Sequence, residues 1–173
     1  MASAVTLSSN GVTLVKKALN SLTAILKKAE ASPKGASLAQ ARLVEDMLPL
    51  TFQAFMVADC AQKCIARTTG TEPLSLDRNI TTFEQMYDCI RQASEIVDKA
   101  DKELVDKRAG ETVPIGMGKG KNFTIASANY VNGYALPNIF FHLNMAYAIA
   151  RKEGVELTKP DYQSSFLTEY LIQ

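Results

Sequence analysis

The segment that most constrains the fold is LPLTFQAFMVADCAQKCIARTTG, residues 48–70, which is apolar on nearly every side from Leu48 to Ile65. A helix that is apolar all round must be covered by other elements of the protein. Pro49 suits the first turn of such a helix, and Gly70 is typical of a residue that ends one. We therefore expect a central helix with neighbours on all sides.

Three further long helices are predicted around it. Residues 12–32 repeat apolar side chains at intervals of three and four, with Ser9 or Asn10 as the expected cap. A third helix begins after Thr81 or Thr82, since Glu84 or Gln85 completes a capping box. Its inner stripe is Phe83, Tyr87, Ile90, Ser94, Val97, Asp101 and Leu104.

The fourth long helix is expected from Ser127, as its cap, to Gly154, with an interruption at Pro137. Residues 37–47 predict a short connecting helix, residues 71–79 a loop, and the tail after Gly154 an extended chain with an apolar end.

Residues 111–127, ETVPIGMGKGKNFTIAS, place two β-prone runs on either side of GKGK, which is typical of a hairpin. A phosphate-binding loop is the rival interpretation, but the Walker ending is missing. The prediction is an all-α four-helix bundle with a short β-hairpin between helices three and four.

Composition limits the functional classes. A chain of 173 residues predicts one domain, residues 1–173, with enough apolar surface to form its own core. Its net charge of +1 gives no electrostatic basis for nucleic acid or an anionic membrane. No secretory leader or bilayer-spanning segment is apparent, so we expect a cytoplasmic protein with no membrane partner. Cys60 and Cys64 are expected to be small buried side chains rather than nucleophiles.

Two segments and the hairpin between them carry a family resemblance. They are ARLVEDMLPLTFQ from Ala41 and YALPNIFFHLNMAYAIARKEGVELTKPDY from Tyr134. With these the chain resembles the DinB/YfiT-like superfamily of four-helix bundles, in a branch of fungi and bacteria described only as a domain of unknown function. The resemblance implies a DinB-like fold over nearly the whole chain.

The same resemblance bears on metal chemistry. Metal-binding members of the superfamily use one histidine on the second helix and two, spaced by four, on the last. Here His142 matches the first of that last pair, Ala146 stands at the second, and Gln53 is the best match on the second helix. We therefore expect no metal and no other cofactor. A metalloenzyme with an incomplete histidine set, in which Asp59 could help, stays open as an alternative.

His142, the only histidine of the chain, leads the candidate catalytic residues. It fits either a neutral, hydrogen-bonded core imidazole or an acid or base facing a central cavity, since histidine titrates near neutrality. Asp59 fits either a paired structural carboxylate or a catalytic base, because an ionised carboxylate inside a helix bundle needs a partner or a raised pKa. Tyr130 is the third candidate, as a hydroxyl donor to a substrate oxygen or as core packing.

A set of apolar and amide side chains near these residues predicts that an apolar small molecule binds in the cavity of the bundle. Its candidate members are Gln53, Phe52, Met56, Tyr87, Tyr134, Asn138, Phe141 and Met145.

The pattern as a whole predicts a metal-independent, cofactor-free enzyme of the isomerase, lyase or cyclase type. Its non-redox acid–base step would be an isomerisation, dehydration or cyclisation of the kind found in secondary metabolism. The alternatives are a non-catalytic small-molecule-binding protein and the metalloenzyme with an incomplete histidine set. The apolar C-terminal segment, SSFLTEYLIQ, also allows a homodimer.

Overall fold

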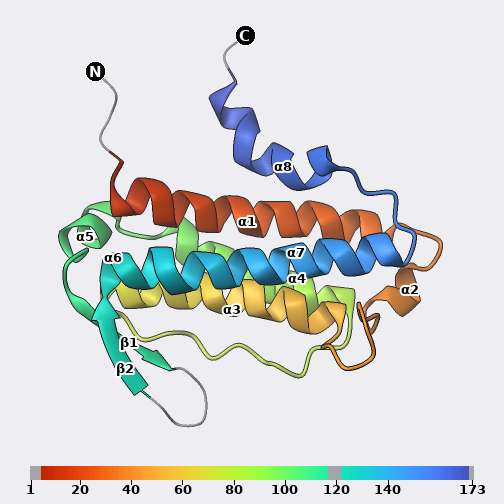
Figure 1. Cartoon of the computed structure of the whole chain (residues 1–173), viewed down its shortest axis with the longest axis horizontal. Helices are drawn as coiled ribbons and strands as arrows, with labels where there is room; N and C mark the ends of the chain where they lie inside the picture. Colours follow the sequence, from red (N-terminus) through yellow and green to blue (C-terminus); the bar gives the residue numbers. More distant parts are fainter. Residues whose placement is uncertain (1–4, 117–121, 172–173) are drawn as a thin grey trace.

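The computed structural model describes residues 5–116 and 122–171. Its long helices are α1 (Leu7–Glu30), α3 (Leu50–Thr69), α4 (Phe83–Asp98) and α7 (Leu136–Lys152). They form a four-helix bundle in which α3 contacts both α4 and α7, and α1 contacts both α7 and α4. Helices α1 and α7 run in one direction, while α3 and α4 run in the other (Figure 1). The predicted all-α bundle is confirmed.

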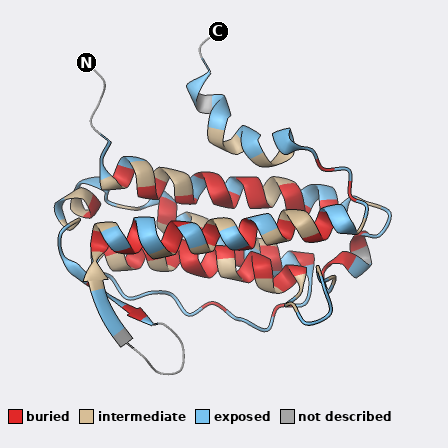
Figure 2. Ribbon diagram, in the orientation of Figure 1, coloured by how far each residue is buried: buried red, intermediate tan, exposed pale blue. Residues whose placement is uncertain are grey.

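The core lies between these helices, where the buried faces of all four meet (Figure 2). Helix α3 is buried along most of its length, as its apolar sequence predicts. Its centre holds side chains with no exposed surface, among them Ala54, Val57, Ala58 and Ala61. None of the described helices is long and apolar enough to cross a bilayer.

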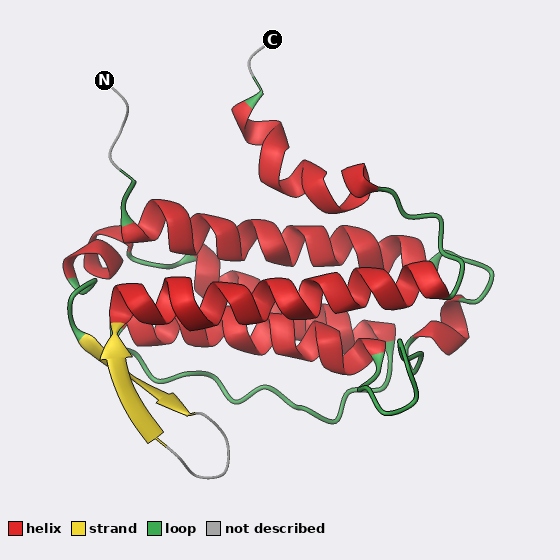
Figure 3. Ribbon diagram, in the orientation of Figure 1, coloured by secondary structure: helices red, strands yellow, loops and turns green. Residues whose placement is uncertain are grey.

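The parallel pair α3 and α4 is joined by a long loop that returns along the bundle (Figure 3). Gln62 fixes the loop to α3, since its side-chain amide both donates to and accepts from the backbone of Leu74, at 2.9 and 3.0 Å. Residues 71–79 therefore form the predicted loop, and it lies against the α3 helix.

The predicted hairpin is confirmed by strands β1 (Thr112–Gly116) and β2 (Asn122–Ala126), which pair antiparallel with Val113 opposite Ile125. The GKGK segment, residues 118–121, lies outside the described residues. Ser127 and Ala128 donate backbone hydrogen bonds to the carbonyls of Glu111 and Ala109, which fixes the base of the hairpin to the start of the last long helix.

That helix reaches its full length in three parts. A short α6 (Ser127–Tyr130) leads into a π-helical turn (Val131–Ala135) and then into α7. The amide of Leu136 donates to the carbonyl of Val131, five residues back. Because Pro137 lacks an N–H and crowds the preceding turn, the wider turn before it lets the helix continue without a break.

Several predicted boundaries are wrong for local reasons. Thr6, not Ser9 or Asn10, caps α1. The predicted helix over residues 37–47 is absent: α2 covers only Gly35–Leu38, and Pro49 disfavours helical backbone in the residue before it. The third helix stops at Asp98, because the side chain of Asp101 accepts from the amide of Leu104 and starts α5 (Lys102–Lys107).

Two predictions at the last helix and beyond it are also wrong. Ser127 does not cap the last long helix, because its hydroxyl is buried without a hydrogen-bond partner among the described residues. The tail is not mainly extended: it forms α8 (Lys159–Leu167) and a 3₁₀ turn (Thr168–Tyr170). Helix α8 lies on α1, where Lys28 pairs with Asp161 at 2.7 Å.

Gly70 ends α3 in the left-handed conformation, with φ of 78°. A Cβ there would also meet the guanidinium of Arg108, but that is the movable end of a long side chain, so it is the backbone conformation that requires glycine. We expect Gly70→Ala to lower the free energy of unfolding by about 1–2 kcal/mol, measured by urea denaturation. Gly110→Ala is the control, since a Cβ at Gly110 meets nothing within 4 Å. Equal stabilities for the two variants would contradict this account.

Candidate functional site

His142 lies on α7 at its contact with α3 and is 9% exposed. Its helical neighbours Ile139, Leu143 and Ala146 have no exposed surface and face the bundle core. The ring therefore lies at the margin of the α3–α7 interface, with one small part open to the surface.

A chain of two hydrogen bonds fixes the protonation of this ring. Gln53 of α3 donates from Nε2 to the carbonyl of Leu48, at 2.9 Å, and its Oε1 lies 2.8 Å from Nδ1 of His142. Because the amide oxygen can only accept, Nδ1 carries the proton and donates to Gln53. Nε2 of His142 therefore holds a lone pair in the neutral ring.

Nε2 forms no hydrogen bond with any described residue. Among the described residues, two fully enclosed side-chain polar atoms lack a hydrogen-bond partner, Arg108 Nε and Ser127 Oγ. Nε2 of His142 is not one of these enclosed atoms. The unpartnered nitrogen is therefore not sealed inside the bundle. It is the atom through which His142 can act on another molecule.

Two aromatic rings flank the imidazole. Phe52 of α3 packs edge-on, with ring centroids 6.0 Å apart, and Phe141 of α7 packs edge-on at 5.2 Å. Phe141 is 53% exposed, and the guanidinium of Arg78 lies 5.1 Å from the centroid of Phe52. The apolar surroundings lower the pKa of His142 to about 4, through burial. The ring is therefore neutral at pH 7.

The other predicted binding residues near His142 are only partly enclosed. Asn138 and Met145 stand one turn before and one turn after His142 on α7, and Met56 stands one turn after Gln53 on α3. All three are half-buried. They could border a molecule bound over the α3–α7 interface, and their binding roles stay predictions.

Asp59 is buried, but its contacts lead away from His142. One carboxylate oxygen pairs with Lys63 and the other accepts from Gln62 at 3.1 Å. Gln62 is the residue that fixes the α3–α4 loop. These contacts correspond to the paired, structural alternative for Asp59, and its catalytic role stays a prediction without a contact to His142.

Tyr130 is separated from His142 by twelve residues, roughly 18 Å along a helix. Its hydroxyl accepts from Arg67 Nη1 at 2.8 Å, and the same guanidinium lies 5.0 Å from its ring centroid. Burial raises the pKa of Tyr130. Tyr134 stacks on it, with centroids 5.7 Å apart. The two tyrosines belong to the hairpin end of the bundle and do not join His142 in one site.

Tyr87 of α4 also lies apart, because its hydroxyl donates to Glu30 of α1 at 2.9 Å. Burial raises the pKa of the Cys60 and Cys64 thiols to about 12, so both are inert as nucleophiles at neutral pH. The structure thus divides the predicted site residues. Gln53, Phe52, Phe141 and His142 are in contact, whereas Asp59, Tyr130, Tyr134 and Tyr87 have partners elsewhere.

The residues around His142 do not fit the superfamily's three-histidine metal site. Ala146 carries no donor atom and is fully buried, and the oxygen of Gln53 is used by His142 itself. Among the described residues, no group of three or more His, Cys, Asp or Glu is arranged to hold a metal ion. One imidazole nitrogen with no second ligand is a poor divalent-metal site.

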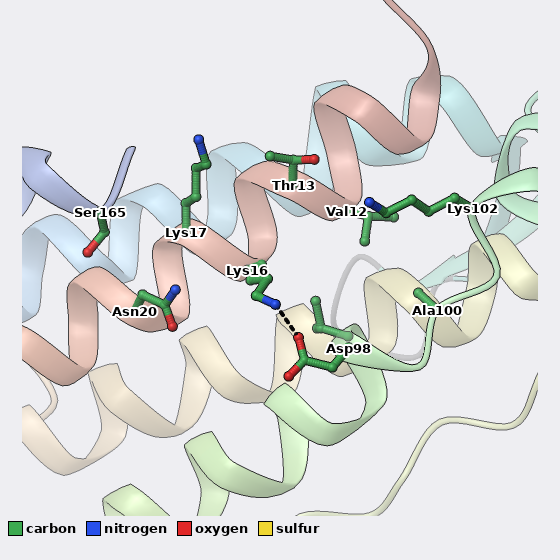
Figure 4. Close-up of a pocket in the computed structure, with 10 residues that line it drawn as sticks. Val12, Thr13, Lys16, Lys17, Asn20, Asp98, Ala100, Lys102 and Ser165 are labelled. Carbon is green, nitrogen blue, oxygen red and sulfur yellow. Dashed lines mark ion pairs between the residues drawn. The ribbon is translucent and has the colours of Figure 1, made fainter. Parts of the chain in front are cut away.

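Several surface pockets lie elsewhere. His142 lines none of five that are formed by described residues. One of about 280 Å³ lies between α1, the end of α4 and α8, where Lys16 and Asp98 point toward each other and pair at 2.7 Å (Figure 4). The cavity predicted beside His142 is therefore not one of these five pockets.

Known proteins share both the sequence pattern and the fold. The family model "Domain of unknown function (DUF1993)" matches residues 7–163. The chain belongs to this family. Among solved structures, the DUF1993 chain is similar to a DinB family member protein from Shewanella denitrificans, with 29% identity and a TM-score of 0.76 over 87% of this chain and 88% of that one. No curated protein matches it.

Two residues at the site escaped the sequence interpretation. Leu48 contributes only its backbone carbonyl, which any residue could supply, so no sequence signal marks it. Arg78 stands in the α3–α4 loop, and helical periodicity does not predict which helix face a loop will cover.

The depressed pKa of His142 predicts a pH-dependent stability. Between about pH 6.5, the value for an unfolded chain, and pH 4, the unfolded state binds a proton that the folded DUF1993 protein does not. The contribution of the neutral His142 ring to stability is complete above pH 6.5 and is lost as the pH falls toward 4. We expect wild type to lose free energy of unfolding relative to His142→Asn across this window, by up to about 1.4 kcal/mol per pH unit.

Urea denaturation of both proteins at matched pH values would measure this difference. Asparagine keeps a donor for Gln53 but does not titrate, so the carboxylates contribute equally to the two curves. Parallel stability curves from pH 7 to pH 4 would contradict the burial of a neutral imidazole.

Proposed function

We propose that this DUF1993 protein is a metal-independent enzyme that uses His142 as a general base. Its substrate is an apolar small molecule that binds over the α3–α7 interface. The step is a non-redox proton transfer, as in an isomerisation, a dehydration or a cyclisation. No cofactor is needed for such a step.

The observation that carries this proposal is the state of Nε2. The ring is neutral at pH 7, its tautomer is fixed by Gln53, and the nitrogen with the lone pair is the one without a protein partner among the described residues. A core histidine that serves packing alone would be expected to use both nitrogens in hydrogen bonds within the protein. A base must instead keep one nitrogen neutral, oriented and open.

The hydrogen-bond chain offsets part of the cost that burial places on the charged ring. When Nε2 takes a proton from a substrate C–H, the electron pair of that bond moves into the substrate, for example to form an enolate. The imidazolium then donates Nδ1–H more strongly to Gln53, whose orientation is held by Leu48. Return of the proton to a second carbon completes an isomerisation, and its delivery to a hydroxyl that leaves as water completes a dehydration.

The surroundings favour an apolar substrate. The rings of Phe52 and Phe141 contact the imidazole. Half-buried residues within one helical turn of His142 or Gln53 add two thioethers, Met56 and Met145, and one amide, Asn138, which would be available for a substrate oxygen. Asp59 and Tyr130 are not part of this mechanism, since their contacts lie elsewhere.

Deuterium incorporation tests the proposal with a mixture of candidate substrates. The protein is incubated in D₂O with a small-molecule extract of the source cells, and mass spectrometry detects compounds that gain carbon-bound deuterium. We expect wild type to label at least one compound, and His142→Asn to label it at least 100-fold more slowly, since a positioned base contributes about 10²–10⁴-fold.

Gln163→Glu, an exposed change on α8, is the control and should label like wild type. Labelling at equal rates by wild type and His142→Asn would overturn the role of His142. Compounds that copurify with both proteins but gain no deuterium would identify a non-catalytic binding protein instead.

A further inference from the structure

We propose that Arg78 binds a carboxylate of the substrate, so that the molecule on which His142 acts is an apolar carboxylic acid. This inference rests on the proposed function and names its substrate class. It is carried by the position and the unpaired charge of a single loop residue.

Arg78 belongs to the loop that returns along the bundle from α3 to α4 (Figure 3). Its guanidinium lies over the ring of Phe52, 5.1 Å from the centroid, and the same ring contacts His142 at 6.0 Å. The sum of these two distances is an upper limit on the separation between the guanidinium carbon and the centre of the imidazole ring. A single aromatic ring therefore brings a permanent cation close to the proposed base.

The charge of Arg78 is unpaired among the described residues. The neighbouring carboxylate of Asp77 accepts from the backbone of Asn79, and the Asp59 carboxylate is occupied by Lys63 and Gln62. Arg78 itself forms no ion pair or hydrogen bond with the described chain. A guanidinium with all its donors unused matches a carboxylate as a bidentate partner, and its stacking on Phe52 limits the entropy lost on binding.

The position of the two groups favours a short acid. The guanidinium and the imidazole both lie against the Phe52 ring, so the acid must pass that ring to reach both. Arylacetic, arylpropionic and arylbutyric acids carry the carboxylate on one, two and three methylene groups and sample this separation. The apolar part of the molecule would lie on Phe52 and Phe141.

Binding of simple acids tests this inference separately from turnover. The probes are phenylacetate, 3-phenylpropionate and 4-phenylbutyrate with their uncharged primary amides, at pH 7 and fixed ionic strength. The readout is the NMR signal of the His142 ring, which is free of overlap because the chain has one histidine. We expect at least one acid to shift this signal and to bind at least fivefold more tightly than its amide.

Arg78→Gln should raise the Kd of that acid at least fivefold and leave the Kd of the amide unchanged, while Arg78→Lys should restore part of the affinity. Arg91→Gln is the matched control, since Arg91 is an exposed arginine paired with Asp88 and Glu95 on α4. No shift with any acid, equal affinities for acid and amide, or an unaltered Kd in Arg78→Gln would each overturn the inference.

The two proposals fail in different ways. If deuterium incorporation depends on His142 but acid binding does not depend on Arg78, His142 remains the proposed base and the carboxylic acid is excluded as the substrate class. If acid binding depends on Arg78 but no deuterium is incorporated, the binding of carboxylates by Arg78 is supported and catalysis by His142 is excluded.

Discussion

The interaction on which the site depends is the hydrogen-bond chain from the Leu48 carbonyl through Gln53 to His142. It joins the start of α3 to the middle of α7 across the bundle. A buried imidazole without such a partner would leave a polar N–H unsatisfied, at a cost of about 1–3 kcal/mol. Because the chain has a direction, it also decides which ring nitrogen carries the proton and which one stays open.

Much of the fold could be predicted because the long helices carry their own signals. Residues 48–70 are apolar all round, and Thr82 with Gln85 forms the capping box that starts α4. The wrong predictions concern features that depend on tertiary contacts. Helix α8 has no fully buried residue and is held by contacts such as Lys28 with Asp161, so its sequence lacks a clear amphipathic pattern. Ser127 fits a cap by type, but its hydroxyl has no amide to accept from among the described residues.

The candidate site was predictable in part for the same reason. A lone histidine on an apolar helix is conspicuous, and Gln53 was named through the family resemblance. Asp59 was equally conspicuous, but sequence alone could not separate a carboxylate paired with Lys63 from an unpaired one. Tyr130 shares a helical stretch with His142, yet Arg67 holds it at the hairpin end. Whether a candidate residue joins His142 is decided by its distance along the helix and by the partners that the folded chain brings to it.

Within the DinB-like fold, this DUF1993 chain has one histidine, hydrogen-bonded to Gln53, where the resemblance to metal-binding members implies three. Ala146 removes one ligand, and Gln53 turns the remaining histidine into a donor on one side and an acceptor on the other. Under the proposed function, this arrangement serves proton transfer rather than metal binding. The proposed role of His142 depends on which of its two ring nitrogens carries the proton.

Long-range ¹H–¹⁵N NMR of His142 at pH 7 measures that tautomer directly. The account predicts a single neutral form, with Nδ1 protonated, Nε2 unprotonated, and no change in either nitrogen down to about pH 5. A ring protonated at Nε2, or one that becomes charged near pH 6.5, would contradict it.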